Sequence, residues 1–158
     1  MVGSFKRSAG VSQFLSATDG LDRGLAVYMA ESGVKDLRQD ALREVISRTN
    51  NLAATASAIG DPPTDEEAQQ LHDLANSIFS VAGTFELHFL AKTSRALCEL
   101  LNILSERGMW RRDIVQLHCD AVRAARDEET LHQSAQEEML LGLEATRASL
   151  QKSNEGAR

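Results

Sequence analysis

Proline, aromatic residues and cysteine are all scarce in this chain of 158 residues. The only prolines are Pro62 and Pro63, and since proline is common in the turns of all-β domains, an all-β fold is disfavoured. Alanine, leucine, glutamate, glutamine and arginine are abundant, and these residues favour helices. The aromatic residues are five phenylalanines, Trp110 and Tyr28, so aliphatic side chains and alanine must fill the core. We therefore expect an all-α domain.

The sequence also lacks a surplus of basic residues and any long apolar run. Lysine and arginine number 17 against 23 aspartates and glutamates, which gives a formal net charge of −6. Because phosphate binding requires a surplus of basic side chains on one face, this balance argues against nucleic acid as the main partner. No run approaches the roughly 18–20 apolar residues of a membrane span. No long apolar segment follows Lys6 and Arg7, so we expect no secretory signal.

Motifs that carry enzyme or metal chemistry are missing as well. There is no glycine-rich phosphate loop, no H-E-x-x-H pair and no C-x-x-C. His118 and Cys119 are adjacent, but neighbouring residues on a helix point about 100° apart and seldom share a metal. His88 and His132 are isolated. Cys98 and Cys119 lie in apolar helical patterns and are expected to be reduced, buried thiols, as in the cytoplasm. We predict no catalytic residue, no metal and no cofactor.

Apolar residues recur at the three-to-four spacing of amphipathic helices over most of the chain. The predicted helical segments cover residues 19–32, 34–59, 64–84, 85–107, 111–125 and 131–150. Gly33 is the predicted stop of the first, and Thr64 with Glu67 forms a predicted capping box at the third. Thr49 and Asn50 interrupt the apolar face of the second, where a kink is an alternative to a continuous helix. Whether the fifth continues through the charged residues 126–129 is left open.

These segments indicate a single domain over residues 1–158. Its predicted architecture is an up-down four-helix bundle over about 34–125, with an N-terminal helix over about 19–32 and a C-terminal helical extension over about 131–152.

One segment resembles a known motif. Residues 75–87 read A-N-S-I-F-S-V-A-G-T-F-E-L, which resembles the motif of histidine-containing phosphotransfer (HPt) domains, approximately A-H-S-I-K-G-G-A-G-T-F-G-F, and is closest to the phosphotransfer domain of the chemotaxis histidine kinase. Without gaps, the matching residues are Ala75, Ser77, Ile78, Ala82, Gly83, Thr84 and Phe85. The resemblance covers about a dozen residues in motif, and about 34–125 in architecture. It implies a four-helix bundle of HPt type with this motif on its second helix.

The departures from that motif fall on the functional positions. The phosphoacceptor histidine of the family falls on Asn76, whose amide nitrogen is not nucleophilic because its lone pair is delocalised into the carbonyl. The family's lysine falls on Phe79, the following glycine on Ser80 and the next glycine on Val81. The resemblance therefore implies an HPt-type fold that has lost phosphotransfer.

In the family this surface docks a receiver domain, whose acidic pocket surrounds a phosphorylatable aspartate. The resemblance implies a cytoplasmic, non-catalytic adaptor of bacterial two-component signalling that binds a response-regulator receiver domain or a histidine kinase. The predicted docking face consists of His72, Asn76, Phe79, Ser80 and Gly83. Phe79 is either an apolar anchor on this face or a side chain turned into the bundle.

Two alternatives remain at the level of sequence. His72 lies one turn before Asn76, and the string H-D-L-A-N-S could be the acceptor site of an active phosphotransfer protein, with Ala75 in place of the lysine. In that alignment the acceptor lies one helical turn farther from Gly83 than the family motif has it. The second alternative is a helical scaffold that forms a homodimer through its terminal helices. Its C-terminal apolar residues are Met139, Leu140, Leu143 and Leu150.

Overall fold

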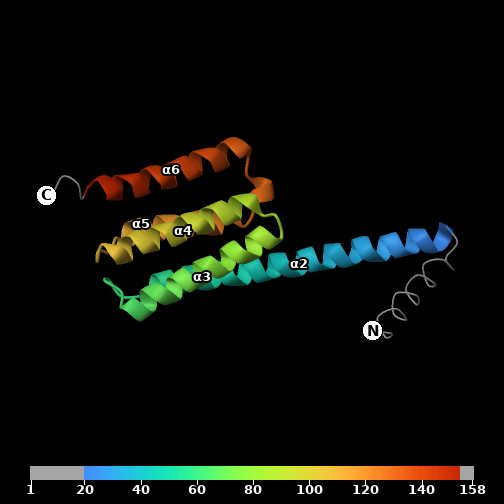
Figure 1. Cartoon of the computed structure of the whole chain (residues 1–158), viewed down its shortest axis with the longest axis horizontal. Helices are drawn as coiled ribbons and strands as arrows, with labels where there is room; N and C mark the ends of the chain where they lie inside the picture. The colour runs from blue at the N-terminus through green and yellow to red at the C-terminus, as the bar shows by residue number, and fades with distance from the viewer. Residues whose placement is uncertain (1–19, 154–158) are drawn as a thin grey trace, which may run out of the picture. The chain divides into compact units, whose positions relative to one another are not determined.

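The computed structural model describes residues 20–153, with side chains placed from Arg23 onward. Within this range the chain is helical and contains no strand (Figure 1). The elements are α2 (Gly20–Ala58), α3 (Asp65–Thr84), α4 (His88–Glu106), α5 (Arg112–Ala125), the short 3₁₀ helix η1 (Glu128–Thr130) and α6 (Gln133–Lys152). The chain divides between Asp40 and Ala41 into two units. The all-α prediction is confirmed.

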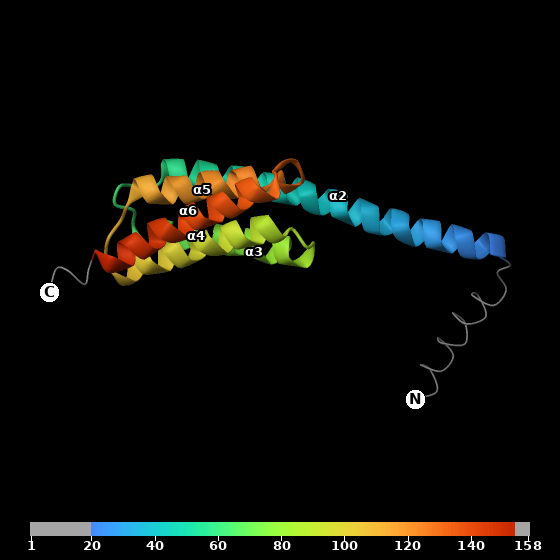
Figure 2. The ribbon, with the colours of Figure 1, turned by 90° about the horizontal axis from the view of Figure 1, so that it is seen from above.

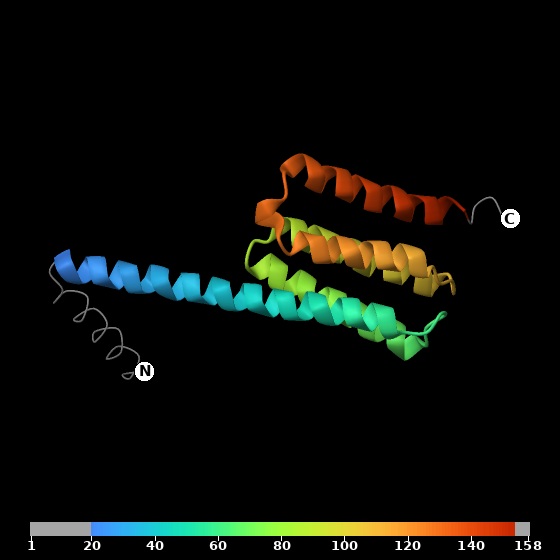
Figure 3. The same cartoon turned by 180° about the vertical axis from the view of Figure 1, so that it is seen from behind.

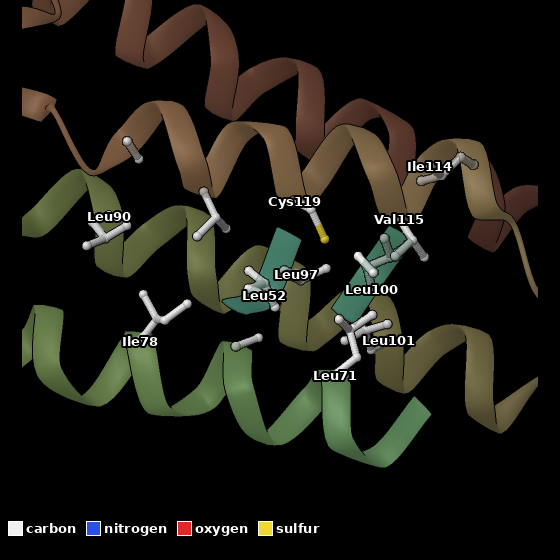
Figure 4. Packing of buried hydrophobic residues seen from close by; sticks show 14 of the residues in the cluster. Leu52, Leu71, Ile78, Leu90, Leu97, Leu100, Leu101, Ile114, Val115 and Cys119 are labelled. Carbon is white, nitrogen blue, oxygen red and sulfur yellow. The ribbon is translucent and has the colours of Figure 1, made fainter. Parts of the chain in front are cut away.

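The second unit is a helical bundle. From Ala41 onward α2 lies alongside α3, α4 and α5, as two perpendicular views show (Figures 2 and 3). Its core is aliphatic, as the shortage of aromatic residues predicts, and Figure 4 shows leucines from α2, α3 and α4 converging on one another. The largest side chains that are almost completely buried include Leu52, Leu71, Ile78, Leu90, Leu97, Leu100 and Leu104. Packing of these side chains supplies most of the driving force for the bundle.

The helix α2 is continuous where two helices are predicted, so the predicted stop at Gly33 is wrong. A C-terminal glycine ends a helix by adopting a left-handed conformation, which Gly108 does with a φ of 58° and Gly33 does not. The helix also continues through Thr49. This side chain is buried, and its hydroxyl donates a hydrogen bond of 2.9 Å to the carbonyl of Val45, so the polar group is satisfied within the helix.

The start of α3 confirms the predicted capping box. The Glu67 amide donates to the Thr64 hydroxyl at 3.2 Å, and the Thr64 amide donates to the Glu67 carboxylate at 2.8 Å. The latter bond lowers the pKa of Glu67. At the other end of the bundle, α5 stops at Ala125 and the acidic residues form a turn and η1, which answers the question left open by the sequence.

The C-terminal helix α6 packs on α4 and α5. Leu143 and Leu150 are buried, and Met139 and Leu140 are half-buried against the core. Arg147 forms an ion pair with Glu99 of α4. The Arg107 guanidinium donates a hydrogen bond of 2.6 Å to the Leu150 carbonyl. The apolar residues that suggest self-association of the C-terminal segment are therefore used inside the chain.

The histidine and the cysteines of the core are held in apolar surroundings. His118 is buried between helices, where its Nδ1 donates to the Ile114 carbonyl at 2.9 Å. Burial lowers its pKa, and the positive charge of Arg147 lowers it further. Burial raises the pKa of Cys98 to about 11 and that of Cys119 to about 12, so both are protonated thiols at neutral pH. Cys119 is buried and Cys98 is half-buried.

Candidate docking face on α3

The five residues of the docking face come together on one side of α3. His72, Asn76, Phe79 and Gly83 follow one another at spacings of four, three and four residues, which places them along one helical stripe, and Ser80 lies beside it. A neighbouring stripe, about 100° around the helix, is fully buried and consists of Leu71, Ala75, Ile78 and Ala82. The amphipathic period of α3 thus separates the core-facing matches to the family motif from the positions where the motif is altered.

Asn76 lies near the middle of α3 and is exposed. In the described part of the chain no hydrogen bond engages its side-chain amide. Its backbone carbonyl accepts a hydrogen bond of 3.0 Å from the Ser80 hydroxyl, and the Ser80 carbonyl accepts one of 3.0 Å from the Thr84 hydroxyl. The two hydroxyls are therefore partly occupied by their own helix, whereas the Asn76 amide is available to a partner.

Phe79 is 37% exposed, so it is not turned into the core. His72 is half-buried, with 27% of its side chain exposed, and its Nδ1 is 3.9 Å from the Asp73 carboxylate. A partly exposed phenylalanine beside uncharged polar groups is the combination that concentrates binding energy in protein interfaces. The exposed position of Phe79 is hard to predict from sequence, because the boundary between core and surface depends on how closely α4 approaches α3.

The second half of α3 carries no charge. No charged residue occurs between Asp73 and Glu86, and α3 as a whole contains neither lysine nor arginine. A phosphoryl group needs a nearby cation or a cluster of N–H donors to offset its negative charge. Residues 74–84 themselves provide no cation, and the nearby Arg48 guanidinium of α2 donates a hydrogen bond of 3.2 Å to the Ser77 carbonyl.

Gly83 has no structural role within the described chain. It is exposed and helical, and a Cβ built on it would meet no atom within 4 Å. Glycine inside a helix costs about 1 kcal/mol relative to alanine. The packing of the bundle therefore does not explain a glycine at this position.

The turn after α3 holds a feature that the sequence analysis missed. Glu86 has a φ of 59°, in the left-handed region that favours glycine. Its amide donates to the Gly83 carbonyl at 3.5 Å, and the Leu87 amide donates to the Ala82 carbonyl at 2.9 Å, which together form a Schellman motif. The HPt motif quoted above has glycine at the position of Glu86. The alignment therefore contains a signal for this left-handed turn, because Glu86 stands where the motif has glycine.

The end of α4 provides an internal comparison. Gly108 has a φ of 58°, and the amides of Gly108 and Met109 donate to the carbonyls of Ser105 and Leu104 at 3.1 and 3.0 Å. The two helices thus end with the same geometry, but only α4 has glycine at the left-handed position. The backbone after α3 adopts a left-handed turn that suits glycine, and the side chain of Glu86 makes this conformation strained.

We expect Glu86→Gly to raise the free energy of unfolding by about 1 kcal/mol, because the strain of a left-handed side chain exceeds the entropy gained by the unfolded glycine. The reciprocal variant Gly108→Ala is expected to lower it by about 1 kcal/mol. Urea unfolding followed by circular dichroism measures both. A Glu86→Gly variant that is less stable than the natural chain would show that Glu86 is not strained.

The rival assignment, with His72 as the acceptor, fits this geometry poorly. In that alignment Ala75 takes the position of the family's lysine, but Ala75 is completely buried and faces the core. The lysine position would then point away from the surface that a receiver approaches. With Asn76 at the acceptor position, the lysine position is Phe79, which is exposed.

The described residues offer no other chemical centre. Among residues 20–153 there is no group of three or more histidine, cysteine, aspartate or glutamate side chains placed to hold a metal ion. Over the same range no helix has both the length and the apolar character needed to cross a membrane. His88 and His132 are exposed at the surface. No protein-family model and no curated protein matches the chain.

Proposed function

We propose that this protein is a cytoplasmic, non-catalytic adaptor of bacterial two-component signalling, with a four-helix bundle of HPt type. It binds a response-regulator receiver domain or a histidine kinase through the docking face and carries no phosphate itself. The observation that carries the proposal is the position of Asn76. This residue points outward from the middle of α3, in a stripe without charge, where the HPt motif would place the phosphoacceptor histidine.

The chemistry of the docking face supports binding without transfer. An asparagine amide donates and accepts hydrogen bonds but forms no stable bond to phosphorus. Phe79 offers apolar area where the family keeps a cation, so affinity can come from burial of its ring. The acidic pocket of a receiver would meet neither a matching cation nor a repelling anion between residues 74 and 84. The adaptor could inhibit, sequester or present its partner.

An active phosphotransfer protein that uses His72 is the second candidate function. Its support is the place of His72 on the same stripe as Asn76, where the side chain is still partly exposed. The two candidates give opposite results in a transfer assay.

We expect no acid-labile phosphate on the full-length protein after incubation with receiver domains that have been phosphorylated with a radiolabelled phosphodonor. The reason is that the position that receives phosphate in the family holds an amide. An HPt domain of established activity is the positive control, and labelled protein is detected after electrophoresis without acid treatment. Transfer that disappears in the His72→Gln variant would overturn the adaptor and establish the second candidate.

A further inference from the structure

Residues 23–40 of α2 expose most of their large apolar side chains. Between Arg23 and Asp40, the exposed large apolar side chains are Leu25, Val27, Tyr28, Met29, Val34 and Leu37, each exposed by 55–67%. Between Ala41 and Ser153, the exposed large apolar residues are Ile46, Phe79, Leu117 and Leu141. Exposed apolar side chains gathered in one segment in this way are a feature of interaction sites.

Part of this surface has the spacing of a coiled-coil seam. Val27, Ala30, Val34 and Leu37 follow one another at intervals of three, four and three residues, and all four are exposed on α2. This is the a and d pattern of a heptad repeat, with valines at a. A seam with this period needs a second helix of the same kind along it, since each side chain must enter a hole formed by a facing helix.

The charge distribution favours a second copy of this chain as that helix. Residues 23–40 contain three basic and three acidic side chains, so the segment is neutral and two copies do not repel each other there. Residues 41–158 carry the full net charge of −6, and two such bundles repel. An antiparallel pair of segments places Ala41 of one copy and Ala41 of the other at opposite ends, which keeps the like charges apart.

The charged residues beside the seam also favour the antiparallel arrangement. Glu31 and Arg38 occupy e positions of the heptads. In an antiparallel pair the e positions of the two helices face each other, so Glu31 of each copy lies opposite Arg38 of the other. In a parallel pair the g positions that face Glu31 and Arg38 are held by Ala26 and Gly33, which offer no charge. From these features we infer that residues 23–40 of α2 form an antiparallel coiled-coil dimer with the same segment of a second copy.

Sedimentation equilibrium of the full-length protein, from about 1 µM to about 500 µM, tests this inference. The mass is expected to rise from that of the monomer towards twice that value. Val34→Glu should raise the dissociation constant by about tenfold or more, because each copy then places a charge in the seam. Leu25→Glu is the matched control, since Leu25 is also an exposed apolar residue of this segment but lies on the opposite side of α2. Circular dichroism confirms that both variants remain helical.

The orientation is tested by charge reversal. Glu31→Arg and Arg38→Glu are each expected to weaken the dimer, and the double variant should regain most of the affinity, because the two opposite pairs are restored with their signs exchanged. Single variants without rescue in the double variant would overturn the antiparallel arrangement. A monomer at every concentration, or equal losses for Val34→Glu and Leu25→Glu, would overturn the dimer. None of these outcomes bears on receiver binding, which rests on α3.

Discussion

Replacement of Phe79 by alanine is expected to weaken binding of a receiver domain by about thirtyfold, the effect of losing an anchor worth about 2 kcal/mol in an interface. The ring is partly exposed at the centre of the docking face and lies among uncharged groups, so a partner that covers the face buries it fully. The free energy of unfolding should fall by about 1–2 kcal/mol, because only 37% of Phe79 is exposed and the rest is covered by the bundle. Binding is therefore measured where circular dichroism shows the variant folded. Isothermal titration calorimetry against a panel of receiver domains measures the loss.

The control for this variant is Leu141→Ala, which removes an exposed apolar side chain of α6, away from the docking face. Gly83→Gln provides an independent test by adding bulk where a partner approaches. A Cβ at Gly83 meets nothing in the chain, and glutamine favours helix, so this variant should be at least as stable as the natural protein and yet bind less tightly. Receiver binding that survives both Phe79→Ala and Gly83→Gln would place the interface elsewhere.

Restoration of the altered positions is expected to create a phosphoacceptor. In the combined variant Asn76→His, Phe79→Lys and Ser80→Gly, an imidazole takes the exposed position at mid-helix, a cation lies one turn away, and the surface beside them is lowered. All three positions are exposed, so the substitutions add no buried charge and leave the core unchanged. The variant should acquire acid-labile phosphate from a phosphorylated receiver that does not label the natural protein. Labelling is expected to rise from background to about one phosphate per molecule.

The matched control replaces Asn76 by glutamine in the same background, which changes the length of the amide without adding a nucleophile, and no labelling is expected. His72→Gln in the combined variant should leave labelling intact, since His72 is not the acceptor. A combined variant that is folded and binds the receiver, but stays unlabelled, would contradict the alignment of Asn76 with the family's histidine.

Local signals predicted much of the fold. The capping box at Thr64 and the apolar period of α3 depend only on residues within a few positions of each other, and the structure places the start of α3 one residue after Thr64. The stop at Gly33 failed because glycine ends a helix only where the backbone turns left-handed, and composition does not determine φ. The packing of α6 involves contacts such as Arg107 with Leu150, which are distant in sequence and leave no local pattern.

Some features of the candidate site could also be predicted from the sequence, and others could not. The outward direction of Asn76 follows from the period of α3, so it could be predicted once Ala75 and Ile78 were assigned to the core. The exposure of Phe79 could not, because it lies at the edge of the apolar stripe and its burial is decided by the neighbouring helix. The strain at Glu86 required a backbone angle that only the structure provides.

The absence of charge between residues 74 and 84 has a kinetic consequence. Fast association of proteins depends on complementary fields that steer the partners together, and here one partner is uncharged at the contact and carries a net charge of −6 overall. An acidic receiver would arrive without steering, at roughly 10⁵–10⁶ M⁻¹s⁻¹ or slower. Added salt would screen the repulsion and speed the encounter. The affinity of such a complex would then depend on slow dissociation, and the dissociation rate would set the duration of the signal.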